Sequence, residues 1–132
     1  MKKRALSFLL LLLALVVIVP GAFAATADLT WPLSATYNED GSTIPPASKA
    51  QIVSTWSMAS SAAGPWTTIY TSAPGETAKT GVPVTVTVGT TYYFRYTCTL
   101  NGKISVPSDP VTASLDYLTP AKPGIGNVIL HP

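Results

Sequence analysis

Alternation of valine and threonine constrains the fold of this chain more than any other feature. The segment VPVTVTVG (82–89) carries valine at every second position, so its apolar side chains share one face of an extended strand. The next segment, TYYFRYTCTL (91–100), alternates in the same way, with aromatic or apolar residues on one face. Asn101-Gly102 follows directly and predicts a tight hairpin, because both residues tolerate a positive φ.

The remainder of the chain from residue 25 also favours strands over helices. It is rich in Thr, Ser, Val, Tyr and Pro, and turn residues interrupt it at intervals of about ten residues, as in an all-β sandwich or barrel. Pro107 and Pro110 mark the last segment as an edge strand, because proline cannot donate to the ladder. Strands are predicted over 28–31, 50–58, 66–72, 82–89, 91–100 and 103–115.

The N-terminus has the pattern of an export signal. A basic start is followed by an apolar run over 5–19, and Ala22-Phe23-Ala24 then supplies a small-x-small cleavage site. The run is shorter than the roughly 20 residues of a membrane-spanning helix, although a retained anchor is the alternative. We expect a signal peptide over 1–24, a domain over 25–117 and a Pro/Gly-rich tail over 118–132, with no stable membrane span after cleavage. The protein would be secreted or on the cell surface, in a bacterial envelope or the extracellular space.

Charge and titratable residues argue against several classes of function. Removal of 1–24 leaves five basic against six acidic residues, so no basic face for nucleic acid is expected. Cys98 and His131 are the only residues of their types, which excludes an intrachain disulfide and leaves too few ligands for a metal site. The acidic residues are scattered over predicted loops and strand ends. We therefore predict a non-enzyme without catalytic, cofactor or metal site, with Cys98 as a buried core thiol and His131 as a solvated tail residue.

Four segments resemble parts of a fibronectin type III domain, and together they cover about residues 27–115. DLTW resembles the second strand, which would place Trp31 at the centre of the core. SSAAGPWTTIY resembles the turn between the third and fourth strands, and NGKISVPSDPVTA resembles the final loop and strand. VGTTYYFRYTCT resembles the sixth strand, so Tyr92 would be the tyrosine-corner residue, its hydroxyl bonded to nearby backbone. The resemblance implies an all-β, immunoglobulin-like β-sandwich of the fibronectin type III type.

The chain departs from that family at its start. Only Ala25, Thr26 and Ala27 lie between the predicted cleavage site and Asp28, where the family has a whole strand. The first strand is therefore missing or supplied by the C-terminal tail. Without it, the strand that carries Trp31 would expose backbone donors and acceptors along one edge.

The tail segment TPAKPGIGNVIL resembles the opening of a fibronectin type III repeat. Val128, Ile129 and Leu130 form the candidate donor strand, and the groove beside Leu29 and Trp31 is the candidate acceptor. The tail has three possible fates: packing on its own domain, donation to another copy, or no partner.

Length makes packing on the same domain marginal, if the tail follows the normal direction of the family. Residues 116–125 would have to cross the domain, and ten residues reach at most about 33–36 Å. A neighbour stacked head to tail would present its groove beside the tail. The sequence therefore favours another copy over the same chain by a thin margin.

We expect an exported, non-enzymatic structural or adhesive protein that assembles head to tail by donor-strand exchange into a filament. Its partners would be copies of itself or another extracellular protein. The alternative is a monomeric binding module that recognises a glycan or protein. Its ligand strip would be Tyr93 and Arg95 on the outer face, with the loops 38–42 and 101–105.

Overall fold

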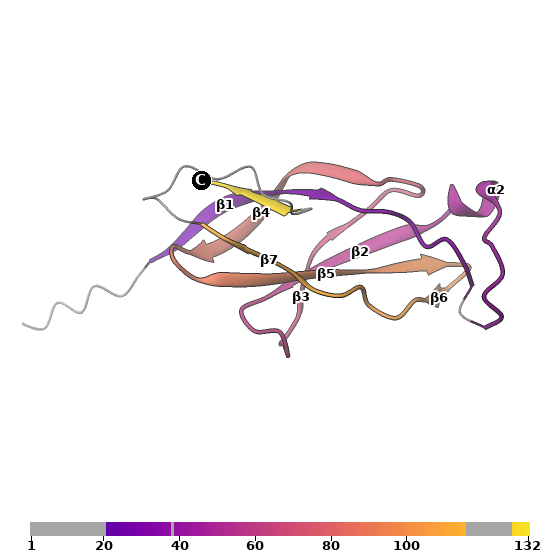
Figure 1. Ribbon diagram of the computed structural model, residues 1–132. Coiled ribbons are helices and arrows are strands. Elements are labelled where there is room, and N and C mark those ends of the chain that lie inside the picture. The colour runs from indigo at the N-terminus through magenta and orange to yellow at the C-terminus, as the bar shows by residue number, and fades with distance from the viewer. Residues whose placement is uncertain (1–20, 38, 116–127) are drawn as a thin grey trace, which may run out of the picture.

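The computed structural model describes residues 21–37, 39–115 and 128–132, which form two antiparallel sheets with almost no helix. One sheet has the strand order β4-β1-β8 and the other β3-β2-β5-β6, with β7 also paired to β5. Figure 1 shows the two sheets as stacked layers. The predicted all-β fold is confirmed, and the two sheets are consistent with a sandwich. The elements are β1 (Ala22–Thr30), α2 (Pro46–Lys49), β2 (Val53–Ala59), β3 (Thr67–Thr71), β4 (Ala78–Thr87), β5 (Thr91–Leu100), β6 (Lys103–Ile104), β7 (Val111–Ser114) and β8 (Val128–His131).

The alternating segments form the strands β4 and β5. Val82, Val84 and Val86 are all buried, while the residues between them are exposed. The hairpin after β5 has positive φ at both central residues, 52° at Asn101 and 76° at Gly102, as the sequence predicts. Local side-chain period and turn chemistry are therefore sufficient to set the faces of these strands.

The main core lies between the sheets around two tryptophans. The rings of Trp31 and Trp56 meet edge to face with centroids 5.7 Å apart, and Tyr96 stacks on Trp56 at 4.9 Å. The indole N–H of Trp31 donates to Ser54 Oγ at 2.9 Å. A smaller apolar cluster of Ile44, Ile52 and Cys98 lies apart from this core.

The predicted return strand over 103–115 is wrong as a continuous element, because it is divided into β6 and β7. Between them, Cys98 N–H donates to Ser105 Oγ and Tyr96 N–H donates to Ser108 Oγ. Serine hydroxyls thus accept the hydrogen bonds that a regular strand would accept with carbonyls. Pro107 and Pro110 lie in this stretch and cannot donate to the ladder.

Tyr70 of β3 makes a contact with a clear pH signature. Its hydroxyl donates to the carboxylate of Glu76, and this bond together with burial raises the pKa of Tyr70 to about 12. Because the folded pKa lies above the ordinary value of 10.0, this contribution to stability is complete below pH 10.0 and is lost as the pH rises through about 12.

Ultraviolet titration of the phenolate absorbance tests this expectation. One tyrosine should ionise near pH 12 in the folded protein, and Glu76→Gln should move that step back toward 10.0. The matched variant Glu39→Gln, remote in sequence, should leave the titration unchanged. An unchanged curve for Glu76→Gln would contradict the assignment.

Candidate functional site

The most distinctive contact joins the two ends of the described chain. Strand β8 pairs antiparallel with β1, with Leu29 opposite Val128, Asp28 opposite Ile129 and Ala27 opposite Leu130. We call this contact the β1–β8 seam. Figure 1 shows β8 beside β1 at the margin of the upper sheet. The tail strand therefore occupies the edge of β1 that the sequence predicted to be open.

Alternation along β8 decides which side chains enter the core. Val128 and Leu130 are buried in the same apolar cluster as Leu29 and Trp31, whereas Ile129 is 43% exposed. Of the two predicted acceptor residues, Leu29 pairs directly with the tail. Trp31 lies beyond the end of β1, where its N–H bonds to Thr77 O, and it contributes to the cluster through its ring.

The tail packs on its own chain, and this is the fate that the sequence ranked below donation to a neighbour. Strand β7 lies across the sandwich from β8, so the last described residues before the tail are already close to the seam. Most of the predicted tail segment 118–132 and the path estimated over 116–125 lie outside the described residues. The estimated reach of ten extended residues therefore does not decide whether the tail strand pairs with its own domain or with a neighbour.

A polar contact on the outer face adds to the seam. Asp28 Oδ2 lies 2.9 Å from His131 Nε2, and Asp28 Oδ1 accepts the Gly81 N–H at 2.9 Å. The Gly81 bond, and secondarily His131, hold the pKa of Asp28 below its ordinary value. The prediction that His131 is solvated missed this pair. If the pairing of β8 with β1 had been known, the alternation of side chains along both strands would have placed Asp28 and His131 on the same face.

The start of β1 overlaps the predicted signal sequence. Residues 1–20 lie outside the described part, but Ala22, Phe23 and Ala24 form the first residues of β1 and pair with Thr87, Val86 and Thr85. Strand β1 is thus longer than the predicted strand 28–31. Cleavage after Ala24 would free one edge of β4 over residues 85–87.

The predicted ligand strip lies on the outer face of the five-stranded sheet. Tyr93 and Arg95 are half-buried on β5, opposite Ala59 and Ser57 of β2. The guanidinium carbon of Arg95 is 4.0 Å from the ring centroid of Trp66, which the sequence did not connect to this strip. Arg95 is therefore stacked on a neighbour within the same chain.

Tyr92, on the opposite face of β5 from Tyr93, reaches back along the chain. Its hydroxyl accepts a hydrogen bond from the Thr87 N–H at 2.9 Å. This contact ties β5 to the end of β4, two residues before the positive-φ Gly89 that turns the chain.

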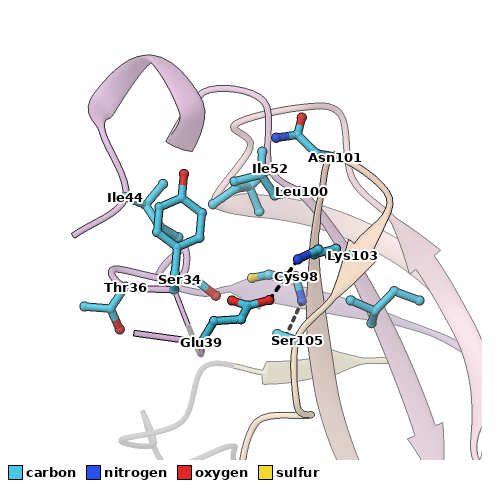
Figure 2. A pocket seen from close by; sticks show the side chains of 12 residues that line it. Ser34, Thr36, Glu39, Ile44, Ile52, Cys98, Leu100, Asn101, Lys103 and Ser105 are labelled. Atoms are coloured by element: carbon cyan, nitrogen blue, oxygen red, sulfur yellow. Dashed lines mark hydrogen bonds and ion pairs between the residues drawn. The ribbon is translucent and has the colours of Figure 1, made fainter. Parts of the chain in front are cut away.

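The two loops that the binding-module alternative named meet at a cavity away from the outer-face strip. Glu39 from the first loop and Asn101, Lys103 and Ser105 from the second line a cavity of about 240 Å³. Asn38 lies outside the described residues. Figure 2 shows the cavity with Glu39 and Lys103 joined across it. Tyr93 and Arg95 are not among its lining residues, so the structure separates the alternative site into two places.

Electrostatics at this cavity are balanced. Lys103 Nζ lies 3.1 Å from Glu39 Oε1, and this bond holds the pKa of Glu39 below its ordinary value. Cys98 forms part of the buried floor, and its thiol lies 3.8 Å from Ser54 Oγ. The cavity thus combines an apolar floor with a neutral ion pair at its rim.

The described residues contain neither a metal-binding cluster nor a membrane-spanning helix. No cluster of three or more His, Cys, Asp or Glu that could bind a metal occurs among those residues. Among the same residues, no helix has the length and apolar character needed to cross a membrane. Comparison with family models, curated proteins and solved structures gave no match.

Proposed function

We propose that this chain is an exported, non-enzymatic structural or adhesive protein whose C-terminal strand can be exchanged between copies. The single observation that carries the proposal is the β1–β8 seam. There the last described strand completes the sheet of the first, with Val128 and Leu130 buried against the core. The position of β8 beside the strand that leads to Trp31 matches the place of the strand that a fibronectin type III domain has first, which supports the likeness to that family.

Exchange between copies follows from the nature of the seam. Every contact of β8 with β1 is made by a short segment that could be presented by an identical chain in the same register. The choice between the same chain and a neighbour depends on concentration and on the intervening segment, and not on the contacts themselves. A strand passed from each chain to the next gives a head-to-tail contact that does not close, and such contacts produce filaments.

Size-exclusion chromatography with light scattering tests the exchange on the purified exported protein. After incubation at rising concentration just below the unfolding temperature, we expect oligomers of increasing mass. Leu130→Asp should remain a monomer, because it places a carboxylate in the buried side of the seam. The control variant Ile129→Lys places its charge on the outward side of the strand, opposite Asp28, where it does not repel the facing carboxylate, and should still form oligomers.

Two results would overturn the exchange. One is a monomeric mass for the unmodified protein at every concentration, which would favour the monomeric binding module with Tyr93 and Arg95 as its ligand strip. The other is equal assembly of Leu130→Asp and the unmodified protein, which would place the contact between copies elsewhere. Circular dichroism of both variants shows whether each retains its β-structure.

A further inference from the structure

We propose that the cavity at the α2 end of the sandwich binds a small, uncharged amphiphile, consisting of a single ring or short aliphatic body with one hydrogen-bonding head. We call this site the end cavity, lined by Ser34, Thr36, Tyr37, Glu39, Ile44, Ile52, Cys98, Leu100, Asn101, Lys103, Ile104 and Ser105. It lies apart from the β1–β8 seam, and its occupancy does not depend on strand exchange.

Two walls from distant parts of the chain form the end cavity. One wall is the loop between β1 and α2, which is held as a small hairpin by Ile44 N–H donating to Ala35 O and Tyr37 N–H donating to Ser42 O. The other wall is the β5–β6 hairpin. The cavity is therefore bounded on two sides by segments whose described residues are hydrogen-bonded within each wall.

The floor selects an apolar body. Ile44, Ile52 and Cys98 form a buried apolar cluster there, and Leu100 packs against it. Figure 2 shows Ile44, Ile52 and Leu100 around one part of the cavity, with the Cys98 sulfur nearby. A volume of about 240 Å³ exceeds the 150 Å³ or so of an engineered protein cavity that binds benzene. A substituted single ring therefore fits.

The surroundings select an uncharged head. Glu39 and Lys103 are the charged residues lining the cavity, and they pair with each other, so the lining carries no net charge that would offset the loss of hydration of an ionic head. An adjoining cavity shares Ser34, Thr36, Cys98 and Ser105 with the first and adds Ser108. The hydroxyls of Ser34 and Thr36, which line both cavities, can donate a hydrogen bond to a hydroxyl or amide head or accept one from it.

The ion pair also gives the ligand a route of entry. Glu39 and Lys103 come from opposite walls, and both side chains are largely exposed. Such exposed pairs are weak and salt-sensitive. The pair can therefore separate to admit a ligand at little cost and re-form beside it.

Isothermal titration with 4-ethylphenol tests the proposal on the purified protein. We expect binding, with at least tenfold weaker binding of 4-ethylbenzoate and of 4-ethylbenzylammonium. Amide chemical-shift changes should centre on the two walls of the end cavity. Ser34→Phe fills the cavity from its rim and should reduce affinity at least tenfold, while the matched Ser60→Phe on the exposed β2–β3 turn should not.

Several results would overturn the proposal. They are the absence of heat and shift changes with 4-ethylphenol, shift changes confined to other regions, or equal binding by the Ser34→Phe protein. Equal affinity for the charged analogues would overturn the assignment of an uncharged head. Leu100→Trp fills the same cavity from β5 and should also abolish binding, so the test stands if Ser34→Phe does not fold.

Discussion

Replacement of Phe94 by alanine should lower the free energy of unfolding by about 3–5 kcal/mol, the usual cost of truncating a buried aromatic side chain. Phe94 is 0% exposed and lies on β5, the strand that pairs with β2, β6 and β7. Its removal leaves a void in the larger core cluster between the two sheets. Because domains of this size have a total stability of roughly 5–15 kcal/mol, the variant would be close to unfolded at physiological temperature.

Urea denaturation followed by tryptophan fluorescence measures this effect. Ile104→Ala is the matched control, because it also truncates a large apolar side chain but at a residue that is 69% exposed. Its effect should stay within about 0.5 kcal/mol. A loss of less than about 1 kcal/mol for Phe94→Ala would show that the side chain is not enclosed as described.

Replacement of Ser54 by alanine should cost about 1–3 kcal/mol, although it removes only one oxygen atom. The Ser54 side chain is fully buried, and its hydroxyl accepts the indole N–H of Trp31. Without that acceptor, a buried donor is left without a partner. Trp56 Nε1 is already buried without a hydrogen-bond partner, so the variant would add a second such donor to the same cluster.

A double-mutant cycle separates this effect from lost packing. Trp31→Phe removes the donor, so Ser54→Ala should cost much less in that background than alone. Ser57→Ala, on the outward face of the same strand, is the matched control and should have little effect. Additive losses in the cycle would show that the Trp31–Ser54 bond does not contribute.

Local sequence pattern predicts much of the sandwich and little of its long-range pairing. The bounds of β5 and the faces of β4 and β5 follow from alternation and from Asn101-Gly102, which are properties of neighbouring residues. The division between β6 and β7 depends on hydroxyls of Ser105 and Ser108 that replace carbonyl acceptors, and alternation contains no signal for that exchange.

The candidate sites were harder to predict for the same reason. The tail strand and the open edge of β1 were both visible in the sequence, because an apolar run and a short lead are local features. The partner of Arg95 and the pairing of Glu39 with Lys103 were not, since each joins residues far apart in the chain. Tertiary contacts likewise decide whether β8 pairs with its own chain or with another copy. The strand propensity of the tail residues does not distinguish these two outcomes.

The register of the β1–β8 seam bears on where the two paired strands stand along the chain. His131 lies opposite Thr26, so the final strand runs antiparallel along the later part of β1 and ends two residues beyond the predicted cleavage site after Ala24. Transferring the segment Val128–His131 to the front, joined to Thr26 by a two-residue turn, would make an ordinary β-hairpin of the two strands. In such a circularly rearranged chain the closing strand is tethered at the seam itself, so handing it to a neighbour would require opening a hairpin. In the natural order no hairpin joins these two strands, so the exchange that we propose would not have to open one.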